Sequence, residues 1–314
     1  MADEHRLRER SQLAAGSAQV CLNCGAPLSG PFCAGCGQRD IPPYPSVREL
    51  AVDAVSEFSG WDGRLSSTLR ALIRRPGVLT HDFLEGRRVR YISPLRVYLT
   101  ASLVYFVLAA SAPTVRLESG QTLGMRVAAT RTGDNASRPQ RVGAAASASL
   151  EGNGTLTPAE REAALKDIER APALMQPFLR RAVADPIGFK RGILETMPRM
   201  LFVLLPLFAG IVALFYRGRK YPEHLYFAIH LHAFIFLALA TTELAKFTRI
   251  PLLAGVASFA AVLWIPIYAT LAIRRVYGGS LARTLMKEVA IGAIYAVTAV
   301  VAFVVMIYWV SIAA

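Results

Sequence analysis

Charged residues are scarce in this 314-residue sequence: Asp, Glu, Lys and Arg make up 18% of it, whereas apolar residues make up 54%. The mean hydropathy is correspondingly positive, at +0.38. So little charge excludes an ordinary pair of soluble domains, although the length alone would suggest one. The composition instead predicts an integral membrane protein.

The N-terminal region lacks the apolar run that a secretory signal peptide requires. No such run occurs in the first 60 residues, which also carry several charges. We therefore expect a flexible tail over residues 1–18, followed by a small domain that precedes the membrane.

Five stretches are long and apolar enough to cross a bilayer core of about 30 Å, which takes about 17 to 25 helical residues. They are residues 95–112, 200–216, 224–245, 250–273 and 289–314. The predicted fold is an all-α polytopic membrane protein, with a transmembrane domain over residues 94–314. A long loop, 113–199, separates the first two spans and is expected to be external and partly disordered, because its first half is rich in Ala, Gly, Ser and Thr.

The second half of that loop has helical signals. Thr157-Pro158-Ala159-Glu160 matches a capping box with proline at the first helical position, which predicts a helix to about Arg170. Residues 174–195 mix apolar and basic side chains, a pattern typical of short amphipathic pieces on a lipid surface. A soluble hairpin that touches nothing is the alternative.

The basic residues are concentrated beside three span ends. Residues 64–96 hold eight Arg and two acids, and residues 217–223 and 274–288 are also basic; together they carry +11 of the net charge of +13. Short loops rich in Lys and Arg stay in the cytoplasm, so five spans place the N-terminus inside. Residues 1–63 hold five Arg and eight acids, so the basic patch that nucleic acid binding requires is missing and nucleic acid is not an expected partner.

Cysteine is rare, and all four cysteines fall within sixteen residues as two CxxC-Gly pairs: Cys21, Cys24, Cys33 and Cys36. Two such knuckles can direct four thiolates at one ion, and four thiolates select zinc or iron. We expect a closed zinc ribbon over residues 19–40 with one structural zinc ion. Two disulfides or a rubredoxin-like iron centre are the alternatives, and a cytoplasmic location disfavours disulfides.

Several motifs together resemble a bacterial inner-membrane family of unknown function with an N-terminal zinc ribbon. These motifs are Cys21-x-x-Cys24-Gly25, Phe32-Cys33-x-x-Cys36-Gly37-Gln38, Pro76-Gly77, Gly86-Arg87-Arg88-x-Arg90-Tyr91-x-x-Pro94-Leu95-Arg96-x-Tyr98 and Glu223-His224-Leu225-x-Phe227-Ala228-x-His230-x-His232-x-Phe234. The resemblance covers most of the chain outside residues 113–197. It implies zinc, the bacterial inner membrane and no assigned activity.

Residues 41–93 are expected to form basic amphipathic helices at the membrane interface, split near Pro76-Gly77. Apolar residues recur there at helical spacing beside Arg side chains, which suits contact with anionic lipid headgroups. A sharper hypothesis is a phosphate or lipid-headgroup pocket built from four arginines: Arg87, Arg88, Arg90 and Arg96.

The third predicted span carries a set of ionisable residues: Glu223, His224, His230, His232 and Glu243. Ionisable groups in a membrane are costly and are functional candidates by default. At about 100° per residue, Glu223 and His230 share one helix face, and His232 and Glu243 share another. Interhelical hydrogen bonds, a polar pathway for a proton, ion or small solute, and a metal or haem site all remain open.

The favoured function is a membrane-anchored interaction or regulatory module whose zinc ribbon docks a cytoplasmic protein partner. The alternatives are a small-solute or ion transport protein that uses the Glu/His set, and a membrane enzyme with a histidine-bound metal. No nucleophile elbow, phosphate loop or dinucleotide fingerprint appears in the required context.

Overall fold

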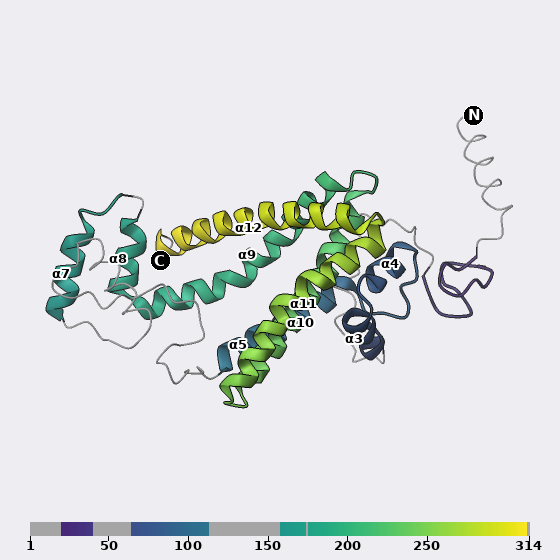
Figure 1. Ribbon diagram of the computed structural model, residues 1–314, viewed down its shortest axis with the longest axis horizontal. Helices are drawn as coiled ribbons and strands as arrows, with labels where there is room; N and C mark the ends of the chain where they lie inside the picture. The colour runs from purple at the N-terminus through teal and green to yellow at the C-terminus, as the bar shows by residue number, and fades with distance from the viewer. Residues whose placement is uncertain (1–19, 40–63, 113–157, 174, 313–314) are drawn as a thin grey trace. The chain divides into compact units, whose positions relative to one another are not determined.

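The computed structural model describes residues 20–39, 64–112, 158–173 and 175–312 (Figure 1). Within these ranges the chain is helical, with two isolated antiparallel bridges near the cysteines and no strand. The chain divides into two compact units: unit 1 is Met1–Pro113 with Val212–Val289, and unit 2 is Thr114–Ile211 with Ala290–Ala314. The expectations for residues 1–18, 41–63 and 113–157 lie outside the described residues.

Among the residues that the structure describes, five helices are long and apolar enough to cross a membrane, which matches the predicted number of spans. They are α5 (Pro94–Ser111), α9 (Pro186–Phe215), α10 (Tyr221–Lys246), α11 (Pro251–Tyr277) and α12 (Leu281–Ile312).

One boundary differs clearly from the expectation, because α9 begins at Pro186 rather than near residue 200. Residues 186–195, expected as short surface pieces, are therefore the first turns of this helix. Pro198 and Pro206 lie inside it. A long helix can pass through such prolines when neighbouring groups satisfy the freed carbonyls.

Helix α10 forms the centre of unit 1, where it packs against α5 and α11 (Figure 1). In its most apolar stretch of 18 residues, 72% are buried, compared with 22% in α5 and 28% in α11. Aromatic rings fill both contacts: Tyr98 of α5 meets Phe236 with ring centroids 5.6 Å apart, and Tyr268 of α11 stacks on Phe234 at 3.5 Å. The helix with the most ionisable residues is thus also the most enclosed one.

Helices α3 (Arg64–Arg74) and α4 (Val78–Leu84) pack on these spans. They are separated at Pro76-Gly77, as the sequence predicted. The Tyr268 hydroxyl donates a 2.6 Å hydrogen bond to the carbonyl of Leu72 in α3. A Cβ at Gly77 would lie 2.9 Å from the backbone of Ala272 in α11, so only glycine allows α4 to start this close to the span.

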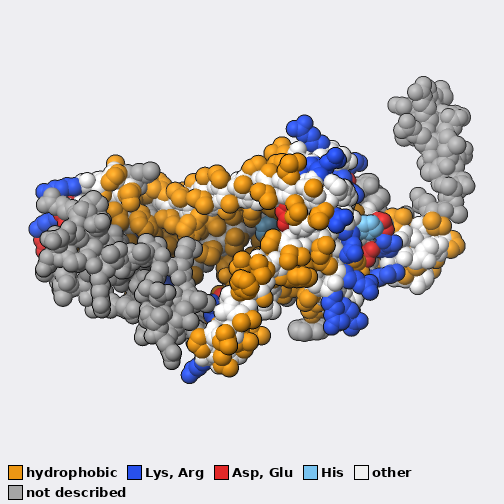
Figure 2. Space-filling view, in the orientation of Figure 1, with side chains coloured by type: hydrophobic (Ala, Val, Ile, Leu, Met, Phe, Trp, Pro, Cys, Tyr) orange, Lys and Arg blue, Asp and Glu red, His pale blue; other side chains and the backbone are white. Residues whose placement is uncertain are grey.

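The three basic segments of unit 1 meet at one end of α10 and α11. Arg275 donates to the carbonyl of Pro76 at 2.6 Å, Arg219 to that of Val276 at 2.7 Å and Lys287 to that of Phe215 at 2.7 Å. Lys and Arg side chains gather over this end in the space-filling view (Figure 2). Lys246 lies at the other end of α10, so basic residues are more numerous at the first end without being confined to it.

Unit 2 contains α7 (Pro158–Ile168), α8 (Gln176–Ala184) and parts of α9 and α12. Helix α7 ends close to the predicted Arg170. All four helices contribute to one buried apolar core: Ala164, Ile168, Leu179, Ala182, Val183, Phe189 and Val310. The α7–α8 hairpin is therefore not isolated, because its apolar face is covered by α9 and α12.

Candidate metal centre and basic pocket

The four cysteines lie on two knuckles with the same backbone geometry. In each knuckle the first cysteine donates its N–H to the carbonyl five residues later, and the glycine after the second cysteine donates to the first cysteine's carbonyl. All four hydrogen bonds measure 2.8 Å. Gly25 and Gly37 have φ values of 75° and 71°, the left-handed conformation that glycine adopts at little cost. The two CxxC-Gly repeats thus fold as the sequence predicted.

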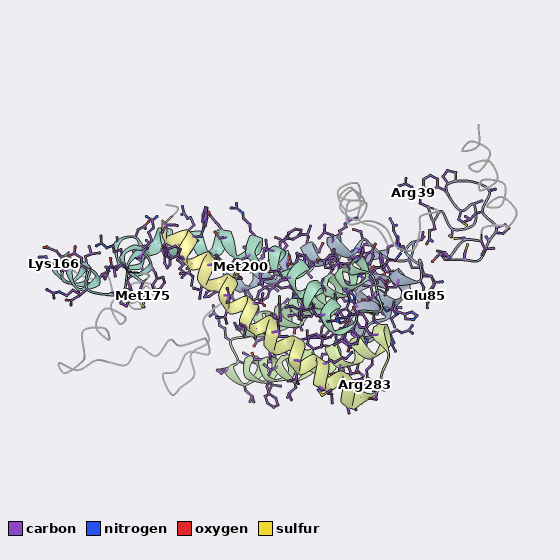
Figure 3. The ribbon with its side chains drawn as sticks, turned by 90° about the horizontal axis from the view of Figure 1, so that it is seen from above. Arg39, Glu85, Lys166, Met175, Met200 and Arg283 are labelled. Atoms are coloured by element: carbon purple, nitrogen blue, oxygen red, sulfur yellow. The ribbon has the colours of Figure 1, made fainter. Side chains whose placement is uncertain are left out.

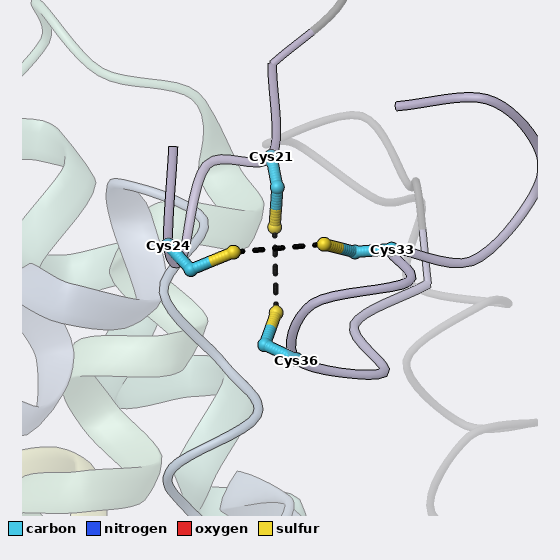
Figure 4. Close-up of side chains that lie close together, drawn as sticks. All are labelled: Cys21, Cys24, Cys33 and Cys36. Carbon is cyan, nitrogen blue, oxygen red and sulfur yellow. Dashed lines mark hydrogen bonds between the residues drawn. The ribbon is translucent and has the colours of Figure 1, made fainter. Parts of the chain in front are cut away.

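The four sulfur atoms converge on one point (Figure 4). All lie within 4.8 Å of one another, and both the Cys21–Cys36 and the Cys24–Cys33 sulfur pairs are 3.5 Å apart. A disulfide is about 2.05 Å long, whereas a tetrahedron with metal–sulfur bonds of about 2.3 Å has edges of about 3.8 Å. The cysteines are therefore free thiols in an arrangement that can hold one metal ion.

Hydrogen bonds shift the pKa values of two of the thiols in opposite directions. The backbone N–H of Gln38 lowers the pKa of Cys36 to about 6. The backbone N–H of Ala26 acts to lower that of Cys24, but the neighbouring sulfurs of Cys33 and Cys36 outweigh it and raise the pKa of Cys24 to about 12. Four thiolates this close repel one another, and a metal ion removes that repulsion.

A single glutamine holds the cysteine module, residues 20–39, to the basic loop, residues 85–93. The side-chain amide of Gln38 donates to the carbonyl of Gly86 at 2.8 Å. Its oxygen accepts from the N–H groups of Arg88 and Val89 at 3.2 and 3.4 Å. Gly86 has a φ of 81°, and a Cβ there would lie 2.6 Å from Leu22. Glycine thus allows the close approach of the module, and Gln38 fixes it.

The rest of unit 1 holds the basic loop from the other side. The hydroxyl of Thr68 in α3 accepts the N–H of Ile92 at 3.1 Å. The Tyr91 hydroxyl donates to the Asp82 carboxylate at 2.7 Å, and burial together with this hydrogen bond raises the pKa of Tyr91 to about 12. Tyr91 therefore stays protonated and keeps its donor role at physiological pH.

A cavity of about 230 Å³ lies where the cysteine module, the basic loop and the spans meet. Its lining comes from five segments: residues 37–39, the start of α3, residues 83–91, the start of α5 and Tyr226 of α10. Three of the lining residues are arginines, namely Arg39, Arg64 and Arg88, and no Asp or Glu lines it among the residues that the structure describes. We call this cavity the basic pocket.

The structure separates the four arginines that the sequence grouped. Arg88 lines the basic pocket, with its guanidinium 5.9 Å from the centre of the Tyr226 ring. Arg87 forms ion pairs with Asp82, at 3.0 Å, and with Glu85. Arg90 is exposed, and neither it nor Arg96 lines the pocket.

The two remaining pocket arginines were not predicted. Arg39 follows Gln38 in the cysteine module (Figure 3), and Arg64 is the first residue of α3. They lie far from Arg88 in the sequence, so residue spacing carried no signal of their proximity.

The Glu and His residues of α10 each meet a separate partner. The Glu223 carboxylate accepts from Arg219 at 2.7 Å and from the N–H of Lys220 at 3.0 Å. The other four pairs, at 2.7 to 3.0 Å, are His224 with Tyr277, His230 with Thr80, His232 with the Ala228 carbonyl and Glu243 with Lys246.

These five residues do not converge on one site. In the described part of the chain, the four cysteines form the only group of three or more His, Cys, Asp or Glu side chains whose ligand atoms lie close enough for a metal ion. A cavity of about 10 Å³ beside His230 has room for about one water molecule, and the other four residues do not line it. The Nε2 atoms of His224 and His230 are buried without a hydrogen-bond partner.

Comparison with known proteins gives one partial match. A family model described as a protein of unknown function (DUF3667) matches residues 62–106. These residues span α3, α4, the basic loop and most of α5, so they include the Pro76-Gly77 and Gly-Arg-Arg motifs but neither the cysteines nor the Glu/His set. No curated protein and no solved structure matches the chain.

Proposed function

We propose that this chain is an integral protein of the bacterial inner membrane that acts as a membrane-anchored docking module, with a zinc-bound ribbon as its docking domain. Five apolar helices support membrane insertion. Zinc is the proposed ion because a closed set of four thiolates is the usual ligand set of structural zinc. The four cysteines would hold the ion. The bound ion would take the place of the hydrophobic core that a module of this size lacks.

The proposed orientation places the ribbon in the cytoplasm. The three basic segments lie at one end of α10 and α11, as the hydrogen bonds of Arg275, Arg219 and Lys287 show. Clustered Lys and Arg beside short loops favour the cytoplasmic side. A reducing compartment also keeps cysteines available as metal ligands instead of disulfides.

The observation that carries the docking role is the exposed apolar surface of the anchored module. Val20 and Phe32 stand at equivalent positions, each directly before the first cysteine of a knuckle, and are 55% and 59% exposed. Gln38, a different residue of the module, holds it to the basic loop through the hydrogen bond to Gly86. A large aromatic side chain presented on a rigid support is typical of the anchor residues of protein interfaces. A protein with an apolar patch is the partner that this surface suits.

Site-specific photo-crosslinking in cells tests this role. A photo-crosslinking amino acid in place of Phe32 should yield an adduct with a distinct protein, whereas one in place of Ser29, an exposed residue of the same module, should not. The adduct should disappear when Cys21→Ser and Cys36→Ser remove two metal ligands. Absence of a protein adduct, or an adduct that persists without the cysteines, would overturn the docking role.

The Glu/His set supports neither of the other two functions. Transport needs a continuous polar path, but each residue is bonded to its own partner, and the cavity at His230 is about 10 Å³. An enzyme with a histidine-bound metal needs imidazole nitrogens that converge, and these residues do not form a ligand group. We therefore assign the set a structural role. His224 and His230 make hydrogen bonds to Tyr277 of α11 and Thr80 of α4, as interhelical polar contacts in membranes commonly do, and the other three residues bond within α10 or to the loop before it.

A further inference from the structure

We propose that the basic pocket binds a phosphate group, carried either by a lipid headgroup or by free phosphate. This inference does not rest on partner docking by the ribbon. Its basis is the cavity itself, the positive groups around it and its position at the start of the apolar helix α5.

The size of the pocket limits its ligand. At about 230 Å³ it is smaller than the roughly 300–1,000 Å³ of sites for drug-sized molecules. A nucleotide or a large cofactor would not fit within it. A phosphate group, with or without a short polar attachment such as glycerol, is of suitable size.

The charges around the pocket select an anion. Arg39, Arg64 and Arg88 approach it from three segments that are distant in the sequence. The charged side chains that line the pocket in the described part of the chain are these three arginines, and the two acids of the surrounding segment, Asp82 and Glu85, form ion pairs with Arg87. The described lining therefore offers an anion three guanidinium groups and no carboxylate.

The type of donor favours phosphate over a carboxylate. A guanidinium presents five N–H groups in a planar fork that matches phosphate oxygens. Arg88 can thus donate to the Phe83 carbonyl, at 3.4 Å, and to a ligand at the same time. A phosphate monoester offers three terminal oxygens and up to about two charges, enough to engage three guanidinium groups, whereas a carboxylate offers two oxygens and one charge.

Backbone dipoles add to this preference. Ser93, Pro94 and Leu95 line the pocket where the 18-residue helix α5 begins. The N-terminus of a helix carries partial positive charge and N–H groups without intrahelical partners, which favour anions. Here this end contributes to a pocket that already holds three arginines.

The position of the pocket explains why a lipid headgroup is one source of the phosphate. Helix α5 begins beside it, and Phe83, Tyr91 and Tyr226, which is in the second turn of α10, supply aromatic walls. Helix ends with aromatic and basic side chains mark the headgroup level of a bilayer. Free phosphate from the aqueous side would meet the same donors.

Binding measurements on the full-length protein distinguish the two sources. The protein is purified in a detergent without phosphate groups. It is titrated with inorganic phosphate by calorimetry and with a short-chain phosphatidic acid by native mass spectrometry, with the matching phosphatidylcholine as the reference. Tighter binding of phosphatidic acid identifies a headgroup site, and equal affinity for inorganic phosphate identifies a site for free phosphate.

Two matched variants test the site. Arg88→Gln should weaken phosphate binding by about tenfold or more, because it removes a charge-assisted hydrogen-bond donor. Arg90→Gln removes the same charge two residues away, outside the pocket, and should leave affinity within about twofold. If Arg88→Gln does not fold, judged by metal content and thermal unfolding, Arg39→Gln should show the same tenfold loss. Failure to bind either probe, or equal losses in Arg88→Gln and Arg90→Gln, would overturn the proposal.

Discussion

Unit 1 contains two groups of polar side chains that differ in their surroundings. The Glu and His residues of α10 sit in the most enclosed span, and the space beside His230 is about 10 Å³. The basic pocket is about 230 Å³ and draws its lining from five segments. An ionisable residue in a membrane span is a functional candidate, but a binding site also needs room for a ligand. Only the second group provides it.

The largest expected effect is the loss of the metal. Replacing Cys21 and Cys36 by serine should reduce metal content from one ion per chain to none, measured by elemental analysis. Because structural zinc supplies about 10–16 kcal/mol of apparent binding free energy, the module should unfold and become sensitive to protease. Ser29→Ala should retain the metal. A double variant that stays protease-resistant would show that the ribbon does not depend on the ion.

Removing a histidine of α10 should affect stability without affecting binding. His230→Ala leaves a cavity in a packed interior and removes the 3.0 Å hydrogen bond to Thr80, so we expect a loss of about 2–4 kcal/mol, measured by unfolding in detergent. Phosphate affinity should not change. If His230→Ala kept the unfolding free energy of the unmodified protein but bound phosphate much more weakly, His230 would act in phosphate binding and the distinction between the two groups would fail.

The contact between the cysteine module and the basic loop should weaken when Gln38 is shortened. Gln38→Ala removes one hydrogen bond to Gly86 and two from Arg88 and Val89. A loss of about 1–3 kcal/mol is expected, seen as faster amide exchange at Arg88 and Val89 while the metal remains bound. Gln176→Ala, which removes comparable hydrogen bonds in unit 2, is the matched control. Unchanged exchange in Gln38→Ala would mean that other contacts hold the module.

The smallest expected effect is at the other end of α10. Glu243 and Lys246 form an i, i+3 ion pair at 2.7 Å near the end of the helix. Glu243 is largely buried, but Gln keeps its volume and a hydrogen-bond acceptor for Lys246, so Glu243→Gln should lower the unfolding temperature only slightly. A cost above about 3 kcal/mol, the range for breaking a buried ion pair, would show that the charge of Glu243 itself is required.

Local properties of the sequence were enough to predict the framework. Hydropathy and length identified all five spans, since backbone groups in lipid must bond within their own segment. The CxxC-Gly spacing predicted both the knuckles and the convergence of Cys21 with Cys36. The start of α9 was not predicted, because its first turns are too basic to resemble a span.

The basic pocket could not be predicted, because it depends on contacts between distant segments. Gln38 lies 48 residues from Gly86, and no local pattern specifies that pair. The sequence correctly marked the Gly-Arg-Arg motif as basic. It could not show that Arg87 turns toward Asp82 whereas Arg88 faces the pocket. Side-chain direction in a loop is set by tertiary contacts, which residue types alone do not reveal.

The cysteine module and the basic loop are expected to form one metal-dependent structure, because Gln38 joins them. Hydrogen exchange of the full-length protein in detergent, with and without a chelator, tests this directly. We predict that metal removal accelerates exchange both at residues 20–39 and at Arg88 and Val89, with α10 unchanged. Acceleration confined to residues 20–39 would contradict the claim, because it would show that the ribbon folds without supporting the loop.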